Sequence, residues 1–273
     1  GVAVDGSGNV YVTDQSNHTI RKIAPNGDVT TVAGSSGNRG SVDANGTSAS
    51  FNFPAELAVD GSGNVYVADR GNHKIRKIAP NGDVTTFAGS GSSGSADGNG
   101  TSASFNSPYG IAVDGSGNVY VADTGSQKIR KIAPNGDVTT LAGSVYGDTD
   151  GTGTAARFAN PFGVAVDGSG NVYVADTGNH KIRKIASNGD VTTIAGSGST
   201  GNTDGNGTSA SFRNPFGVAV DSSGNVYVAD GFNHKIRKIA PNGDVTTFVG
   251  SGSTGNTDGN GTAASFNVLR GVA

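Results

Sequence analysis

The histidines of this chain recur at one position of a repeated sequence, and this regularity limits the chemistry they can do. They are His18, His73, His180 and His234, and Gln127 stands at the corresponding place of one copy. Metal ligands must converge on one point, whereas equivalent side chains of successive repeats lie one repeat apart. We therefore expect each His to make a structural hydrogen bond within its own blade, and no His to bind a metal.

A second motif with the composition of a metal loop is Asp-Gly-Ser-Gly-Asn. It occurs at 5–9, 60–64, 114–118 and 167–171. Calcium loops of the EF-hand type supply alternating oxygen ligands and end with a Glu at position twelve. Counting from Asp5, position twelve is Ser16, and no copy has Glu there. The motif is therefore interpreted as a turn, and neither a metal nor any other cofactor is expected.

The types and spacing of these residues do not indicate an active site. Active sites combine different side chains around one point, whereas near-identical repeats supply the same side chain several times. Glycosidase-type chemistry needs two carboxylates in distinct environments, and the chain has a single Glu, Glu56. No catalytic residue is predicted.

These residues are carried by a long repeat. Its copies begin at Gly1, Glu56, Gly110, Gly163 and Gly217, so the spacings are 55, 54, 53 and 54 residues. A fixed period of this length is typical of stacked supersecondary units. We therefore expect one domain, 1–273. Its repeats are 1–55, 56–109, 110–162, 163–216 and 217–270, followed by the start of a further repeat at 271–273.

Within each repeat the pattern predicts four short antiparallel strands. In one copy they are 163–167, 172–176, 180–185 and 191–195, separated by turn sequences rich in Gly, Ser and Asn. The second strand is apolar on both faces, which favours a sheet packed between two similar sheets. The predicted fold is therefore an all-β β-propeller of four-stranded blades. A parallel β-helix is the alternative.

The repeat also resembles a known family. Asn-His-Lys-Ile stands at 72–75, 179–182 and 233–236, next to Gly-Val-Ala-Val-Asp and Pro-Asn-Gly-Asp segments, and this combination is similar to the NHL repeat. The resemblance implies a six-bladed ring, although five repeats are visible and a five-bladed ring remains the alternative. The chain contains no Met, so we expect it to be processed or truncated. Five repeats leave a gap in a six-bladed ring, so we also expect residues 1–273 not to close a ring by themselves.

Composition and charge exclude several partners. The net charge is −3. The chain has no Cys, and this absence rules out disulfides and thiolate metal sites. No apolar run reaches the length of a membrane span. Arg-Lys pairs on the third strands could form a basic band, but no aromatic residues interleave for base stacking. We expect their stems to cover apolar surface with the charged heads in water, near Asp, and no nucleic acid to bind.

The copies differ mainly after the second strand and around the proline that opens each repeat. Because strand direction alternates, both places lie at the same end of every blade. The residues there are of types enriched at interfaces. They define a candidate binding face for a protein or carbohydrate, or for other copies of the chain: Arg70, Tyr109, Phe162, Phe216 and Phe232. Unconstrained drift of loop residues is the alternative explanation.

The long loops between repeats carry two further sets of residues. A Phe precedes each proline position by three residues, and we expect it to be a buried anchor because long loops need packing of their own. The five anchors are Phe51, Phe105, Phe158, Phe212 and Phe266. Asn-Gly-Thr sequences match glycosylation acceptors at Asn45, Asn99, Asn206 and Asn260.

Together these observations indicate a non-enzymatic interaction or structural module. We expect a bacterial protein that is extracellular or exposed at the cell surface. A propeller enzyme of the lyase or lactonase type with a central divalent metal is one alternative, and an RNA-binding NHL module is another.

Overall fold

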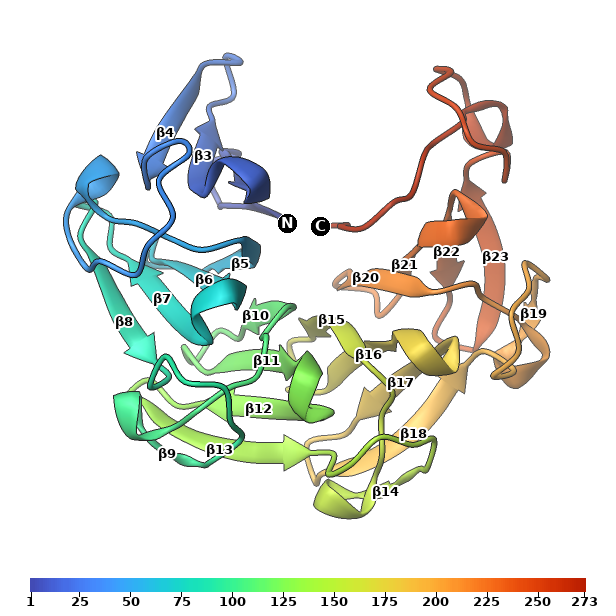
Figure 1. Cartoon of the computed structure of the whole chain (residues 1–273). Helices are drawn as coiled ribbons and strands as arrows, with labels where there is room; N and C mark the ends of the chain where they lie inside the picture. The colour runs from blue at the N-terminus through green and yellow to red at the C-terminus, as the bar shows by residue number, and fades with distance from the viewer. The chain divides into compact units, whose positions relative to one another are not determined.

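The computed structural model describes residues 1–273 and shows an all-β propeller fold of five four-stranded antiparallel blades (Figure 1). It contains 3-10 turns but no α-helix. None of its helical turns is long or apolar enough to cross a bilayer. The chain divides into two compact units, which are described separately: Gly1–Thr140 with Ala273, and Leu141–Val272.

The first unit holds blades 1 and 2 and most of blade 3. Blade 1 comprises β1 (Val2–Val4), β2 (Val10–Asp14), β3 (Thr19–Ile23) and β4 (Val29–Ala33). Blade 2 comprises β5 (Pro54–Val59), β6 (Val65–Asp69), β7 (Lys74–Ile78) and β8 (Val84–Ala88). Blade 3 comprises β10 (Ile111–Val113), β11 (Val119–Asp123), β12 (Lys128–Ile132) and β13 (Asp137–Ala142).

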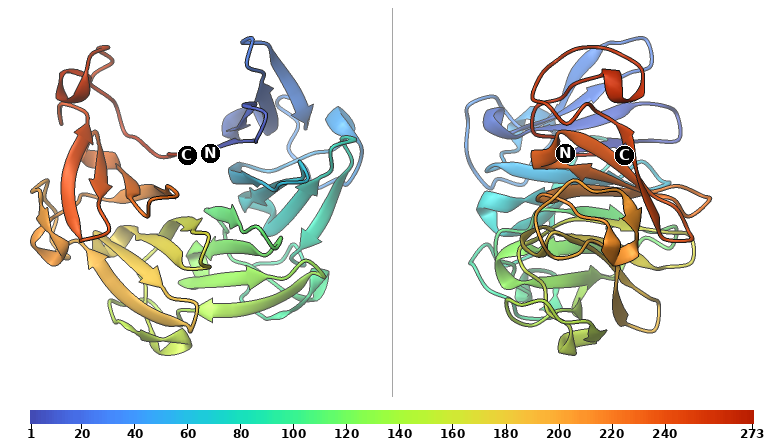
Figure 2. Two further views of the ribbon diagram at one scale, coloured as in Figure 1. Left: turned by 180° about the vertical axis from the view of Figure 1, so that it is seen from behind. Right: turned by 90° about the vertical axis from the view of Figure 1, so that its right-hand side faces the viewer.

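The second unit holds blades 4 and 5. Blade 4 comprises β15 (Pro161–Val166), β16 (Val172–Asp176), β17 (Lys181–Ile185) and β18 (Asp190–Ala195). Blade 5 comprises β20 (Pro215–Val220), β21 (Val226–Asp230), β22 (Lys235–Ile239) and β23 (Asp244–Val249). The stretch after β23, dark red in Figure 2, contains one 3-10 turn, η10 (Gly261–Ala263), and no strand.

Strand alternation gives every blade two different apolar faces. In β6 and β7, Val67 pairs with Arg76 on one face, while Tyr66 pairs with Lys77 on the other. Within the first unit the Tyr face of one blade packs on the Val face of the next, because Tyr11 joins a core cluster with Val65 and Val67. In the second unit Tyr173 shares a cluster with Val226 and Val228 in the same way.

Each long loop runs along the outer strand of the blade that follows it. Three loops form a short fifth strand there: β9 (Gly98–Asn99) on β13, β14 (Gly151–Thr152) on β18 and β19 (Gly205–Asn206) on β23. Gly89 begins one such loop with φ of 103°, and a Cβ there would lie 2.6 Å from the carbonyl oxygen of His73. A side chain at this bend is therefore excluded by both conformation and space.

Candidate interaction surface

A buried arginine on the third strand of blades 2 to 5 fixes the loop that precedes each blade. Arg130 donates from Nη1 to Asp123 Oδ2 at 3.0 Å and from Nη2 to Asp97 Oδ1 at 2.6 Å. Two loop carbonyls accept further bonds from this guanidinium, whose central carbon lies 5.2 Å from the centre of the Phe105 ring. Equivalent contacts are made by Arg76, Arg183 and Arg237.

This geometry corrects the expectation that the arginine heads lie in water. All four side chains are 0% exposed, because the loop and its Asp cover them. Burial raises the pKa of Asp123 and Asp176 to about 6, and the lowering effect of backbone N–H donors and of the paired arginine offsets this only in part. The arginines therefore hold the fold together and are not available to an external anion.

The lysines next in sequence point to the opposite face of the strand and lie over tyrosine rings. Lys131 Nζ is 5.8 Å from the centre of the Tyr120 ring, and Lys184 Nζ is 5.8 Å from that of Tyr173. In blades 2 to 5 the Arg of each Arg-Lys pair is buried and the Lys is half-buried, so these pairs do not form a continuous exposed basic band.

The histidines bridge neighbouring blades, which corrects the expectation of a bond within the blade. The backbone N–H of Ser107 donates to His73 Nδ1 at 3.0 Å, and that of Asn214 donates to His180 Nδ1 at 3.2 Å. Each donor belongs to the segment that leads into the next blade. Burial, and secondarily Arg213, lowers the pKa of His180. No group of three or more His, Asp or Glu side chains is arranged to hold a metal ion.

The Asp-Gly-Ser-Gly-Asn segments are turns closed by their own carboxylate. Asp114 Oδ1 accepts the backbone N–H groups of Ser116 and Asn118, both at 2.9 Å. Its Oδ2 accepts Asn118 Nδ2 at 2.8 Å and the Tyr120 hydroxyl at 3.1 Å. Burial raises the pKa of Asp114, but these bonds lower it more, so the net pKa is below the ordinary value. Both carboxylate oxygens are thus used inside the turn.

The loop phenylalanines lie under the buried arginines. Four are 0% exposed: Phe51, Phe105, Phe158 and Phe212. Phe266 differs from the expectation because it is only partly buried. Its counterparts are covered by an arginine of the following blade, and residues 267–273 contain no strand that could supply such an arginine.

The asparagine side chains of the Asn-Gly-Thr sequences form hydrogen bonds between each loop and the blade that follows it. Asn99 Nδ2 donates to the carbonyl of Asn135 at 3.1 Å and to Asp137 Oδ1 at 2.8 Å. Equivalent pairs of bonds are made by Asn45 and Asn206. A glycan on these nitrogens would break both bonds. Asn260 is exposed and its amide makes no such bond.

In the second unit, three residues of the candidate binding face touch one another. The Phe162 and Phe216 rings lie 5.4 Å apart, and those of Phe216 and Phe232 lie 5.8 Å apart. Arg213 lies over Phe232 and Arg270 lies over Phe216, at 5.9 and 5.3 Å from the ring centres. We call these five residues the aromatic–arginine cluster. Phe216 is 8% exposed and Phe232 is 42% exposed. The buried Phe216 ring therefore packs beneath the Phe232 ring, which lies at the surface.

The first unit carries two smaller pairs of the same kind. Arg70 lies 5.9 Å from the ring centre of Tyr109, which is 7% exposed. Arg39 lies 4.4 Å from the ring centre of Phe53. Phe53 is not among the residues predicted from the sequence. The signal that could have found it is its position before the opening proline, where the other copies that have this proline carry Ser or Asn.

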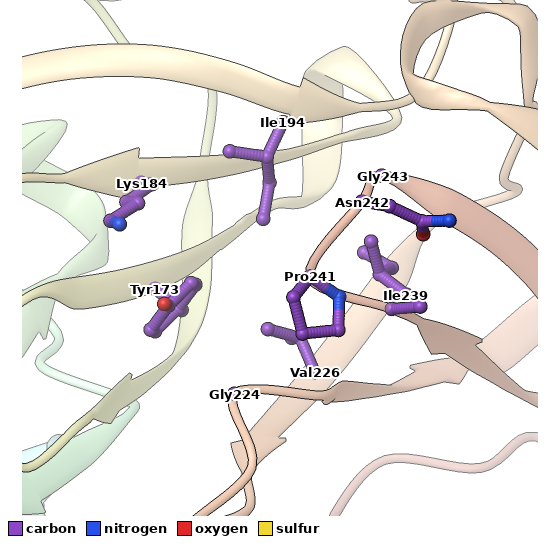
Figure 3. Close-up of a pocket in the computed structure, with 10 residues that line it drawn as sticks. Tyr173, Lys184, Ile194, Gly224, Val226, Ile239, Pro241, Asn242 and Gly243 are labelled. Atoms are coloured by element: carbon purple, nitrogen blue, oxygen red, sulfur yellow. The ribbon is translucent and has the colours of Figure 1, made fainter.

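A pocket of about 270 Å³ lies between blades 4 and 5 (Figure 3). Tyr173, Lys184 and Ile194 line one side, and Val226 and Pro241 face them from the other. All five belong to the repeated framework, and the pocket contains no pair of acid and base groups. We interpret it as a product of blade packing.

Glu56 is the carboxylate without a counterpart, because the other copies have Gly at this place. Burial raises its pKa to about 7, whereas the amino group of Gly1 and the backbone N–H of Ile111 lower it.

Two sequence families match this chain. The NHL repeat matches residues 1–23, 51–78, 105–132 and 158–185, and the Teneurin NHL domain matches 200–270. Protein SUPPRESSOR OF QUENCHING 1, chloroplastic, of Arabidopsis thaliana is 32% identical over 259 residues, which are 88% of this chain and 24% of that protein. NHL repeat-containing protein 2 of Bos taurus is 31% identical over 269 residues, 84% of this chain and 37% of that protein. The chain therefore spans well under half the length of these relatives.

Solved structures with low sequence identity share the fold. A virginiamycin B lyase from Staphylococcus aureus has a TM-score of 0.58 at 16% identity, over 90% of this chain and 68% of that one. An auxiliary nutrient binding protein from Bacteroides thetaiotaomicron has a TM-score of 0.72 at 16% identity, over 99% and 62%. A chain of a Nidogen/Laminin complex has a TM-score of 0.64 at 18% identity, over 90% and 78%. The repeat sequence, the blade architecture and the matched family segments show that this chain belongs to the NHL-repeat family of β-propellers.

Proposed function

We propose that this chain is a non-enzymatic module that binds a protein or carbohydrate partner through the aromatic–arginine cluster. One observation carries the proposal. The repeated residues are used for blade structure, whereas residues that differ between copies meet in this cluster. Aromatic side chains with an adjacent Arg supply much of the binding energy at interfaces. One fold neighbour is a chain of a Nidogen/Laminin complex, so the fold is found in at least one assembly of proteins.

The test compares capture of partners by three immobilised proteins. They are the wild type, the double variant Phe232→Ala/Arg213→Ala, and the control Tyr146→Ala, which removes a ring that is 64% exposed outside the cluster. A specific partner from extracts of the source cells should be retained by wild type and control. We expect its affinity for the double variant to fall at least about tenfold. Equal retention by all three proteins would contradict the proposal.

We also propose that the module acts outside the cell or at the surface of a bacterial cell, in keeping with its Gly-, Ser-, Thr- and Asn-rich loops. Cell fractionation with an antibody tests this, and recovery from the cytosol would contradict it. The enzyme alternative has its own test. A divalent metal recovered at one equivalent per purified chain, and lost together with a lyase activity on chelation, would replace the binding proposal.

A further inference from the structure

The arginines of this chain form two groups that differ in their acidic partners. At the repeated position of blades 2 to 5 each arginine is buried and binds two aspartates, as Arg130 binds Asp97 and Asp123. The arginines outside this repeated position occur in single copies and are exposed. Four of them make no ion pair: Arg39, Arg70, Arg157 and Arg213. The chain therefore has unpaired positive charge on copy-specific residues, although its net charge is −3.

Arg213 combines this unpaired charge with an exposed aromatic ring. Its guanidinium carbon lies 5.9 Å from the centre of the Phe232 ring, which is 42% exposed. A guanidinium that packs its face against a ring keeps its N–H groups at the edge, where two of them fit the two oxygens of a carboxylate. The ring also holds the guanidinium in place, so less conformational entropy is lost when a carboxylate binds.

His180 adds a further hydrogen-bond donor beside Arg213. Its Nδ1 accepts the backbone N–H of Asn214, so the neutral ring carries its proton on Nε2. In blade 5 the corresponding nitrogen of His234 lies 3.1 Å from Thr254 Oγ1, whereas no side chain bonds to His180 Nε2. Burial, and then the positive charge of Arg213, lowers the pKa of His180, so the two side chains share one electropositive environment.

The cluster lacks an exposed carboxylate of its own. Asp230 accepts the backbone N–H of Arg213 at 2.8 Å, but it is 0% exposed and paired with Arg237. Asp148, which the other copies lack, binds Lys181 at 2.6 Å. Neutral sugars present hydroxyl groups that both donate and accept hydrogen bonds, whereas this surface offers donors and apolar rings. A carboxylate next to an apolar side chain therefore fits it better than a neutral sugar does.

The exposure of this site is a property of the turn and does not depend on the position of blade 5 in the chain. Phe232 stands in the turn between β21 and β22, at the place that Gly71 occupies in blade 2. Gly71 is exposed although blade 2 contacts blade 1 through β5 and blade 3 through β5 and β6. This turn is therefore open to solvent even in a blade with a neighbour on each side.

We propose that the aromatic–arginine cluster binds a protein segment in which a carboxylate side chain stands next to an apolar one. The carboxylate accepts hydrogen bonds from the Arg213 guanidinium and from His180 Nε2, and the apolar side chain packs on Phe232. Opposite charge at such a contact contributes to partner choice and speeds association. This assignment rests on the binding function proposed above, and it specifies the chemistry of the partner.

The experiment titrates the isotope-labelled chain with two short peptides that differ only in charge, and follows binding by NMR. The probes are Gly-Glu-Glu-Leu-Glu-Glu-Gly and its amide analogue Gly-Gln-Gln-Leu-Gln-Gln-Gly, both with blocked ends. The acidic peptide should shift the signals of the Arg213 side chain and the Phe232 backbone, and the amide analogue should bind at least about tenfold more weakly. The acidic peptide should also raise the pKa of His180, because its carboxylate offsets the nearby positive charge.

Three variants locate the contact. Arg213→Gln removes the charge and Phe232→Ala removes the ring, so each should weaken binding of the acidic peptide at least about tenfold. Arg157→Gln is the matched control, because it removes an exposed, unpaired arginine outside the cluster, and it should bind like the wild type. Both arginines are exposed, so the melting temperatures of the two Gln variants should stay close to that of the wild type.

The proposal is overturned if the acidic peptide causes no shift at the cluster, or if the two peptides bind equally. It is also overturned if Arg157→Gln weakens binding as much as Arg213→Gln does, because the charge would then act without a specific contact. Tighter binding of a galacturonic acid oligomer than of the acidic peptide would identify an acidic carbohydrate as the partner and overturn it as well. Each of these results leaves the binding function in place, which fails instead when wild type and the double variant Phe232→Ala/Arg213→Ala capture the partner equally.

Discussion

Replacing Phe105 by Ala tests whether the loop phenylalanines anchor the long loops. The ring is 0% exposed, lies 5.2 Å from the Arg130 guanidinium and contacts the bend at Gly89. Loss of its burial alone corresponds to about 1.5–3 kcal/mol. The cavity left under the loop and the arginine increases the cost, so the free energy of unfolding should fall by about 3–5 kcal/mol.

Urea unfolding followed by circular dichroism gives this difference from the midpoint and the slope. Hydrogen exchange adds a local measurement, because the loop amides of Gly94 and Ser104 bond across the loop and should lose protection first. Tyr146→Ala, which removes an exposed ring, should change stability by less than about 0.5 kcal/mol. If Phe105→Ala also costs less than about 0.5 kcal/mol, the ring does not anchor the loop and the reasoning is wrong.

Three further predictions concern the charged groups. Calcium should not raise the melting temperature, because the turn carboxylates are already bonded inside the turn; a calcium-dependent rise abolished by Asp60→Ala would contradict this. The pKa of Asp114 is lower in the folded protein than its ordinary value, so its stabilising effect is complete above about pH 4 and is lost as pH falls through the folded pKa. The melting-temperature advantage of wild type over Asp114→Asn should therefore shrink below about pH 4, and a constant difference would show that the turn bonds do not depend on ionisation. Arg183→Leu should cost about 3–5 kcal/mol because it leaves Asp176 buried without its ion pair, and adding Asp176→Asn should recover part of that loss in urea unfolding.

Contacts within one blade could be predicted from the sequence, and contacts between a blade and its neighbouring segments could not. The strands and the Asp114 turn follow from side-chain alternation and turn composition, which act over a few residues. The partner of Arg130 in the loop, Asp97, lies 33 residues earlier, and the donor to His73 lies 34 residues later. Asp97 belongs to the copy before that of Arg130, and Ser107 belongs to the segment that leads into the blade after that of His73. The expectations of an arginine head in water and of a histidine bond within the blade were therefore both wrong.

A signal for the arginine contact was nevertheless present in the sequence. Each buried arginine follows a loop Asp at the same distance of 33 residues, as Arg76 follows Asp43 and Arg237 follows Asp204. The aromatic–arginine cluster gave only a weaker signal. Its members could be identified as variable, but their ring contacts depend on how strands β15 and β20 pack together with the turn Gly231–Asn233.

The loop that covers the edge of a blade belongs to the sequence repeat before that blade. The structural unit of one blade with its covering loop therefore begins and ends at other residues than the sequence repeat. For blade 3 the folding unit runs from residue 89, after β8, to Ala142 at the end of β13. The repeat of the sequence runs from 110 to 162. Inserting or deleting one whole repeat then replaces a loop-to-blade contact by an identical one. Tandem duplication can therefore lengthen or shorten such a gene without requiring a new contact surface to evolve.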